Sequence, residues 1–305
     1  MINNNQPPIS IGISFYNAEL TLLDAVRSIF AQTHQNWELI LVDDGSTDRS
    51  LEIAQSINDP RVRIYSDGEN LRLAARLNQI TKLAKYDFLA RMDADDLISP
   101  VRLEKQINIL LSQPDVDLVT TGICSLSDDY KPVGFRCVTE EHVITANGLL
   151  SGASGIVHAS LLGRRDWFVR NPYKESMLKS QDTNLWVRSY SKNDLSVAFL
   201  REPLYYYRED GNVTKKQLLL AYEMGRHTIL ADAKAGFNLS VKTRKLIDNL
   251  IKTLAVKLFT KYALKLARNR RNAELLDVLV KESINNEISF IRSIALPLSA
   301  PGRKV

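Results

Sequence analysis

Three carboxylates are crowded into four positions of the chain, just after a short apolar segment with the character of a β-strand. The segment is Tyr86–Ala90, and the carboxylates belong to Asp93, Asp95 and Asp96. Because like charges at short range disfavour ionisation, the cluster is favoured as three anions only when a cation lies among them. Carboxylate oxygens suit a hard divalent ion, which usually completes its shell with water and substrate phosphates. The cluster therefore predicts a Mg²⁺ or Mn²⁺ site for a phosphate-bearing substrate.

Two other kinds of acidic turn have similar sequences. An exposed loop that caps the following helix is common, since Asp and Ser are good N-caps, and this alternative stays open. A calcium loop of the EF-hand type needs Gly at its sixth position, where this chain has Ile98, and Pro100 interrupts the pattern. The sequence therefore argues against a calcium loop.

The elements that position the cluster alternate between strand and helix through the first hundred residues. Four segments have the character of strands: residues 9–15 alternate at period two, residues 37–42 are a continuous apolar run, and residues 62–65 and 86–90 are shorter segments of the same kind. Apolar residues at helical spacing lie between them, and Asn17 is expected to cap the first of these helices. Such alternation is typical of an α/β domain with a parallel sheet, in which ligands bind beyond the carboxyl ends of the strands.

Three polar segments follow three of these strands, namely Phe15–Asn17, Asp43–Asp44 and Asp93–Asp96. We therefore expect them to meet at one edge of the sheet. From about residue 101 the pattern is mixed, with helices expected at 102–112 and 181–191, a strand at 116–122, a hairpin-like region at 124–137, and strands at 156–158, 196–200 and 204–208. Beyond 216 it is nearly all helical, with an apolar stripe from Ile247 to Leu266.

The motifs taken together resemble the family 2 inverting glycosyltransferases, which have the GT-A fold. Five segments carry the resemblance in the family's order, namely Ile13–Asn17, Leu41–Asp48, Ala90–Asp96, Ser180–Arg188 and Leu204–Arg208. It covers roughly residues 9–210. The resemblance implies a Rossmann-like, mostly parallel sheet with helices on both faces over residues 1–215. Residues 1–100 would form the nucleotide-sugar half, 101–215 the acceptor half, and 216–305 a C-terminal helical extension.

In the family a nucleotide-diphospho-sugar, most often UDP-linked, lies across this edge of the sheet. The resemblance assigns seven residues to it, namely Phe15, Asn17, Asp43, Asp44, Arg72, Asp93 and Ala94. Asp93 would contact the ribose, and Asp95 together with Asp93 would hold the Mn²⁺ or Mg²⁺ that neutralises charge on the leaving diphosphate. Helix capping is the alternative role for Asp43 and Asp44, and a surface salt bridge is the alternative for Arg72.

By the same resemblance, Asp182 is the general base that deprotonates the acceptor hydroxyl. The family usually has Glu-Asp here, whereas this chain has Gln181 before Asp182. Losing the adjacent carboxylate removes a like charge that would disfavour ionisation of Asp182. His158, Gln181 and Arg208 are assigned to the acceptor or diphosphate side. Capping of the 181–191 helix is the alternative for Asp182, and a place in the core is the alternative for His158.

We therefore expect a metal-dependent enzyme that moves a hexosyl or hexosaminyl group to a hydroxyl of a glycan or lipid-linked glycan in surface polysaccharide synthesis. One alternative is a sugar-nucleotide nucleotidyltransferase, although its early glycine-rich loop is missing, since residues 9–17 contain only Gly12. A non-catalytic nucleotide-sugar-binding protein is the other. The missing dinucleotide fingerprint after the first strand argues against an oxidoreductase. No nucleic acid partner is expected.

Composition and charge address location. The 305 residues include two isolated cysteines, Cys124 and Cys137, which are too few for a disulfide framework. No signal peptide is evident, and no run approaches the roughly 18 apolar residues of a membrane-spanning helix. We expect a cytoplasmic protein, with the inner face of the membrane left open. Residues 242–271 contain ten Lys or Arg against one acid, Asp248, which favours contact with an anionic membrane surface. The alternative for the basic residues is a solvated helix face. The alternative for the apolar stripe is packing on the catalytic domain or on a second copy in a homodimer.

Overall fold

The computed structural model describes residues 6–208, 214–262, 264 and 277–299. Its centre is a sheet whose first four strands are parallel and have the spatial order β3–β2–β1–β4. These strands are β1 (Ile9–Phe15), β2 (Trp37–Asp43), β3 (Val62–Tyr65) and β4 (Phe88–Asp93). The four predicted strands are therefore confirmed, although β4 continues three residues further than predicted and carries Asp93 at its end.

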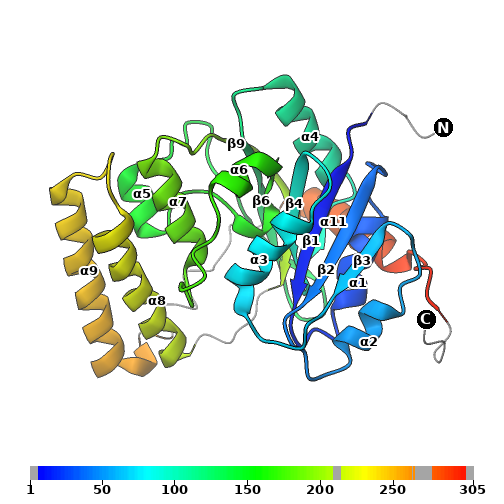
Figure 1. The fold of residues 1–305 in the computed structure, drawn as a ribbon, viewed down its shortest axis with the longest axis horizontal. Coiled ribbons are helices and arrows are strands. Elements are labelled where there is room, and N and C mark those ends of the chain that lie inside the picture. Colours follow the sequence, from blue (N-terminus) through cyan, green and yellow to red (C-terminus); the bar gives the residue numbers. More distant parts are fainter. Residues whose placement is uncertain (1–5, 209–213, 263, 265–276, 300–305) are drawn as a thin grey trace.

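Helices cover both faces of this parallel half (Figure 1). One face is covered by α1 (Leu22–Phe30), α2 (Ser50–Gln55) and α4 (Arg102–Ser112), and the other by α3 (Arg72–Leu83). Successive strand residues point to opposite faces, so Ile11 of β1 joins the first core and Ile40 of β2 the second. Both strands are largely buried on both faces; β2 appears in the sequence as an apolar run, whereas β1 alternates isoleucine with the small residues Ser and Gly.

The packing of α3 on β1 leaves no room for a side chain at Gly12. A Cβ atom at this position would lie 2.2 Å from Cγ2 of Ile80. Glycine in a strand often marks such a close approach. Gly12 therefore serves helix packing in this fold.

The second half of the domain extends the same sheet in the order β4–β8–β6–β9–β5, with β7 paired to β6. The added strands are β5 (Leu97–Ile98), β6 (Leu118–Leu126), β7 (Pro132–Arg136), β8 (Leu162–Arg164) and β9 (Val197–Arg208). β8 is antiparallel to both of its neighbours, whereas β9 is parallel to β6. The complete sheet is mixed, and the expected α/β architecture is confirmed with its parallel part concentrated in the first half.

The connections of this half include α5 (Ala146–Ser151), a short 3-10 helix η1 (His158–Ser160), α6 (Arg165–Arg170) and α7 (Gln181–Ser191). The predicted helices at 102–112 and 181–191 are confirmed. The predicted strand at 156–158 is wrong, because Val157 donates its N–H to the Thr120 hydroxyl and η1 begins at the next residue. The strands predicted at 196–200 and 204–208 are one strand, β9, whose register against β6 shifts between Thr121 and Ile123.

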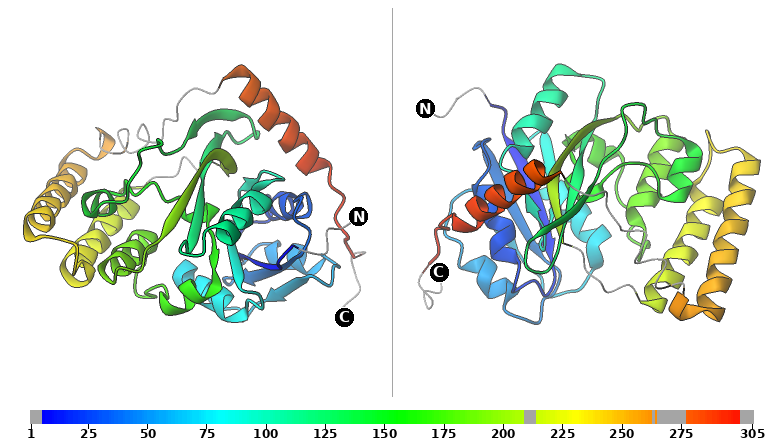
Figure 2. Two further views of the ribbon diagram at one scale, coloured as in Figure 1. Left: turned by 90° about the horizontal axis from the view of Figure 1, so that it is seen from above. Right: turned by 180° about the vertical axis from the view of Figure 1, so that it is seen from behind.

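The C-terminal helices lie at opposite ends of the molecule (Figures 1 and 2). They are α8 (Lys215–His227), a π-helical turn η2 (Thr228–Asp232), α9 (Leu239–Leu258) and α11 (Val278–Ser293). α8 and α9 pack beside α5 and α7, whereas α11 crosses to the back of the first half and packs on α1 and β7. The chain then pairs Leu298 with Ile57, just after α2.

The apolar face of α11 is buried and that of α9 is not. Ile284, Ile288 and Ile291 of α11 are at most 5% exposed and share a core cluster with Leu126 and Tyr206. In contrast, only Val256 of α9 is buried. In the described part of the chain, no helix combines the length and the apolar content needed to cross a bilayer.

Candidate active site

The carboxyl ends of β1 and β4 meet at a polar cleft of about 550 Å³. It is bordered by the segment after β1, the segment after β4, and the end of β9. Six predicted site residues line it together, namely Phe15, Asn17, Asp93, Ala94, Asp95 and Arg208. The expectation that separate segments converge at one edge of the sheet is therefore confirmed for these residues.

The two predicted residues after β1 have structural contacts of their own. Phe15 is 1% exposed and packs in the core, because odd residues of β1 face α1 and α2. The neighbouring Tyr16 is 51% exposed and lines the cleft, as does Tyr207 of β9. Asn17 does not cap α1, whose N-cap position is held by Thr21. Instead its Oδ1 accepts a 2.8 Å hydrogen bond from the backbone N–H of Thr47, in the turn after β2.

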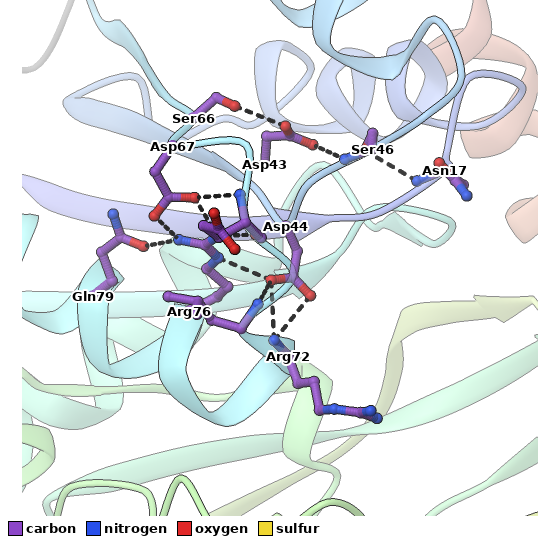
Figure 3. Close-up of polar contacts among 11 residues, drawn as sticks. Asn17, Asp43, Asp44, Ser46, Ser66, Asp67, Arg72, Arg76 and Gln79 are labelled. Carbon is purple, nitrogen blue, oxygen red and sulfur yellow. Dashed lines mark hydrogen bonds and ion pairs between the residues drawn. The ribbon is translucent and has the colours of Figure 1, made fainter.

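The acidic pair after β2 is buried, and its two members have different partners (Figure 3). Asp43 accepts one hydrogen bond on each oxygen, from the Ser46 N–H at 3.0 Å and the Ser66 hydroxyl at 2.8 Å. Asp44 Oδ1 accepts from the Leu71 N–H at 2.8 Å, the Arg72 N–H at 3.0 Å and the Arg76 Nε at 2.9 Å. Asp44 therefore caps a helix, but the helix is α3 rather than the one that directly follows it.

Arg76 is a buried cation that sequence reasoning missed. Its guanidinium is fully buried, lies between Asp44 and Asp67, and also donates to Gln79 (Figure 3). Hydrogen bonding to Arg76 lowers the pKa of Asp67 far below its usual value. A signal was present, because Arg76 is spaced with Leu73, Leu77 and Ile80 on the inward side of α3. A cation at such a position requires a carboxylate partner.

Arg72 has a strained backbone and an extended side chain. Its φ of 71° lies in the left-handed region, which costs a residue with a Cβ of order 1–3 kcal/mol and often marks a functional segment. The two hydrogen bonds from its N–H to Asp44 hold this conformation. The side chain is exposed and extends away from the Asp44–Arg76 contacts (Figure 3). It forms no ion pair within the described residues, so the expected alternative of a surface salt bridge is not seen there.

Asp96, the third aspartate of the cluster after β4, has a structural role because it binds β9. Asp96 is buried, accepts from the Tyr205 hydroxyl at 2.7 Å, and accepts from the Arg208 N–H at 2.8 Å. Burial first, and then the charges of Asp95 and Asp93, raise the pKa of Asp96 well above its usual value. Asp96 does not line the cleft, so Asp93 and Asp95 are the two carboxylates of this cluster that border it.

Arg91 is a second buried cation that sequence reasoning missed. Its Nη2 lies 2.5 Å from Asp93 Oδ1, and its Nε has no hydrogen-bond partner within the described residues. Burial acts to lower the pKa of Arg91, but the charge of Asp93 and weaker effects of Tyr173, Tyr205 and Asp182 raise it. Arg91 is therefore paired with the carboxylate at the end of β4 and is also affected by the charge of the one at the start of α7. Its spacing two residues before Asp93 places both on one face of the strand.

Asp182, the residue assigned as the general base, lies near enough to Arg91 for its charge to raise the pKa of the arginine. Asp182 is in the first turn of α7, after Ser180, whose φ of 56° is left-handed. Within the described residues, the carboxylate of Asp182 makes neither a hydrogen bond nor an ion pair, and Gln181 opens the same helix. The expected alternative, a cap for this helix, is therefore not what the geometry shows for Asp182.

His158 lies beside this helix among aromatic rings. Its Nε2 is 2.7 Å from the Tyr173 hydroxyl, and its ring makes edge contacts with Tyr173 and Trp186. Burial, and to a lesser degree the charge of Arg91, hold the pKa of His158 well below its usual value. His158 is therefore neutral at physiological pH.

Arg208 lies against the Tyr130 ring, which also contacts helix α11. Its guanidinium lies 5.3 Å from the centroid of the Tyr130 ring, and Arg292 of α11 stacks on the same ring at 4.7 Å. Arg292 also pairs with Asp24 of α1 at 3.3 Å. A cation within about 6 Å of an aromatic face is attracted to it. The hairpin residue Tyr130 and helix α11 thus orient a cleft residue, an arrangement that nothing local in the sequence indicates.

Comparison with known proteins agrees with this geometry. Residues 10–168 match the family described as glycosyl transferase family 2. EpsE of Bacillus subtilis, assigned as a glycosyltransferase, is 32% identical over 220 residues, which are 70% of this chain and 77% of EpsE. The Escherichia coli enzyme WfgD, named as a UDP-Glc:α-D-GlcNAc-diphosphoundecaprenol β-1,3-glucosyltransferase, is 27% identical over 62% of this chain and 72% of its own length.

Two solved structures share the fold. Staphylococcus aureus TarS in complex with UDP-GlcNAc superposes with a TM-score of 0.60 at 16% identity, over 93% of this chain and 80% of TarS. The mannosyltransferase PcManGT of Pyrobaculum calidifontis, in complex with GDP-Man and Mn²⁺, gives a TM-score of 0.56 at 13% identity over the same shares of the two chains. The expected GT-A fold and the expected glycosyltransferase activity are confirmed, and the nucleotidyltransferase alternative gains no support. The chain belongs to glycosyl transferase family 2.

Proposed function

We propose that this glycosyltransferase moves a hexosyl or hexosaminyl group, with inversion, from a UDP-linked sugar to a hydroxyl of a glycan or lipid-linked glycan in surface polysaccharide synthesis. The observation that carries the proposal is that Asp93 and Asp95 border one polar cleft at the carboxyl ends of the strands. Asp93 pairs with Arg91, whose pKa is also raised by the charge of Asp182, and the Asp182 carboxylate forms neither a hydrogen bond nor an ion pair within the described residues. The donors in the TarS and WfgD names, UDP-GlcNAc and UDP-Glc, support a UDP-sugar.

We propose that Asp182 accepts the proton of the acceptor hydroxyl as a general base. A catalytic base needs a free oxygen within hydrogen-bond reach of the hydroxyl, and Asp182 meets the first condition. Arg208 and Arg72 would meet the negative charge of the diphosphate, since Arg208 lines the cleft and Arg72 extends from the start of α3 without an ion pair among the described residues. Tyr16, Asn17 and Ala94 would contact the nucleoside, with Phe15, Asp43 and Asp44 shaping the pocket from beneath.

A divalent ion fits the donor side. The carboxylates of Asp93 and Asp95 border one polar cleft and supply hard oxygen donors, but the described residues hold no group of three His, Cys, Asp or Glu that could enclose a metal by itself. Such a site suits Mn²⁺ or Mg²⁺, which can take substrate phosphates and water as further ligands. When bound, the ion would neutralise charge on the departing diphosphate. The Mn²⁺ in the PcManGT complex supports this assignment.

The roles of the three segments of the chain and the cellular location of the enzyme are also part of the proposal. We propose that residues 1–100 hold the donor, 101–215 hold the acceptor, and 216–305 form an extension. We also propose that the enzyme works in the cytoplasm at the inner face of the membrane. The diphosphoundecaprenol acceptor in the WfgD name supports a lipid-linked acceptor.

The test is a thermal-shift screen of UDP-, GDP- and CMP-linked sugars with and without Mn²⁺. We expect the largest stabilisation by a UDP-sugar in the presence of Mn²⁺. Asp95→Ala should abolish the Mn²⁺ dependence, whereas Asp128→Ala, which removes an exposed carboxylate on the β6–β7 turn, should leave it unchanged. Stabilisation that is independent of Mn²⁺ in the wild type would refute the metal assignment.

A further inference from the structure

The outer face of α9 is apolar although nothing in the described chain covers it. Five residues form this face and are 52–65% exposed, namely Ile247, Leu250, Ile251, Leu254 and Leu258. Their spacing places them on one stripe of the helix, which in a globular protein normally faces the core. The face of α9 that does meet the protein is more polar. There Asn249 and Thr253 accept hydrogen bonds from Arg226 of α8, at 2.7 and 2.9 Å.

The position of α9 makes the stripe a surface of the whole molecule. In Figure 1 and in both views of Figure 2, α9 is the outermost helix at one end, beyond α5, α7 and α8. α8 lies alongside it, and no other described element lies outside it. We refer to the five residues of this face as the α9 stripe. A contiguous exposed apolar surface of this kind marks an interaction site rather than a scattered set of surface residues.

Cations border the α9 stripe. Three exposed basic residues on or just after the helix flank the stripe, namely Arg244, Lys257 and Lys261, whereas the exposed Lys252 lies on the side of α9 that faces α8. Residues 239–262 contain a single acid, Asp248, and its carboxylate lies 3.8 Å from Lys245. The first turn of α8 adds the exposed Lys215 and Lys216. The partner must therefore offer an apolar phase and negative charge together.

We propose that α9 docks the protein on an anionic lipid surface, with the helix lying in the plane of the bilayer. The α9 stripe would enter the boundary between headgroups and acyl chains, and the cations would meet lipid phosphates. A second copy is a poorer fit. In a two-fold dimer the same patch meets itself, so the basic borders of the two copies would lie side by side as like charges.

Hydrogen bonds connect the turn before α9 to α7, the helix that carries the proposed base. Asn184 of α7 donates to Thr228 at 3.1 Å and to Asp232 at 2.8 Å, both in the turn between α8 and α9. Asp182 lies half a turn before Asn184 in α7. Docking through α9 would therefore bring the acceptor half, rather than the nucleotide half, to the membrane. The inference concerns attachment and holds whether or not the transferred sugar is the one proposed above.

The experiment is co-sedimentation of the full chain with vesicles of phosphatidylcholine, with and without phosphatidylglycerol. We expect binding to the anionic vesicles, weakened by salt because the Debye length falls from about 10 Å at 0.1 M to about 3 Å at 1 M. The double variant Arg244→Gln with Lys257→Gln should bind about fivefold more weakly for each cation removed, since each contributes about 1 kcal/mol. The double variant Leu250→Asn with Leu254→Asn should lose roughly tenfold or more.

Leu111→Asn is the matched control, because Leu111 of α4 is 52% exposed and lies outside the α9 stripe. It should bind vesicles as the wild type does. Circular dichroism and transfer to a water-soluble acceptor keep loss of docking separate from loss of folding or of activity. Equal binding to neutral and anionic vesicles, or none, would overturn the proposal. So would a wild-type dimer in sedimentation velocity that the Leu250 and Leu254 substitutions dissociate, since a second copy would then be the occupant.

Discussion

Replacing Asp44 tests whether this residue serves the fold or only the ligand. In Asp44→Ala, the N–H groups of Leu71 and Arg72 lose their acceptor, and the buried Arg76 loses one of its two carboxylates. Removing one partner of a buried ion pair costs about 3–5 kcal/mol, and losing a helix cap costs about 1 kcal/mol. Arg76 keeps Asp67, whose side chain is 45% exposed, so the lower end applies. We expect a loss of about 3 kcal/mol in the free energy of unfolding.

Urea unfolding followed by circular dichroism measures this effect. With a slope of about 3 kcal/mol per molar urea, the midpoint should fall by about 1 M. The control is Glu52→Ala, because the Arg49–Glu52 pair is exposed on both sides and surface pairs contribute little. The control midpoint should not move. An Asp44→Ala midpoint equal to that of wild type, with UDP binding lost, would refute the reasoning and make Asp44 a ligand residue alone.

Three further predictions concern single residues. The pKa of folded His158 lies well below the value of about 6.5 expected when unfolded, so its neutral form contributes stability that is present above pH 6.5 and lost as pH falls. Between pH 7 and 5 the unfolding free energy of wild type should therefore fall more steeply than that of His158→Asn. The two slopes should differ by at most about 1.4 kcal/mol per pH unit, and parallel curves would contradict this prediction. Tyr130→Ala should raise the donor KM about twofold to fivefold by releasing Arg208, since such contacts contribute about 0.5–1 kcal/mol, whereas Tyr130→Phe should keep the wild-type value. Gly12→Ala should lower the free energy of unfolding by about 1–3 kcal/mol, because the added Cβ meets Ile80, and an unchanged thermal midpoint would argue against the close approach.

The elements that the sequence predicts best are those whose burial pattern is local. The period-two alternation of β1 and the apolar run of β2 predict strands without knowledge of the neighbours. The helices α4 and α7 match their predicted bounds for a similar reason, because an amphipathic repeat is a property of the segment itself. The predictions that proved wrong depend on distant contacts. Asn17 accepts from Thr47, thirty residues away, and is therefore not available to α1.

The stripes of α9 and α11 show the same limit on a larger scale. Both helices have apolar residues at helical spacing, and the sequence cannot tell which stripe will be covered. α11 places Ile288 in a core against Tyr206, whereas α9 leaves Leu254 exposed. What distinguishes them is the shape of the remaining molecule, which no local pattern contains.

In the candidate site, the carboxylates could be predicted and their cationic partners could not. Asp93 and Asp95 stand out as like charges at a strand end. Arg76 and Arg91 appear as ordinary residues of a helix and a strand until the fold buries them beside Asp44 and Asp93. Arg76 meets Asp44 from a distant segment, and Arg91, although only two residues from Asp93, becomes a buried cation only when the fold covers its strand.

The most direct test of the account is the effect of Asp182→Asn on transfer and on donor binding, measured on the same preparation. The substitution keeps the shape of the side chain and removes its capacity to accept a proton as a base. We predict that transfer from the UDP-sugar falls by roughly 10²–10⁴-fold, while the Kd for UDP with Mn²⁺ stays within about twofold of wild type, a change below 0.5 kcal/mol. Transfer that persists near the wild-type rate, or donor binding that falls in parallel with it, would contradict the assignment of Asp182 as the base.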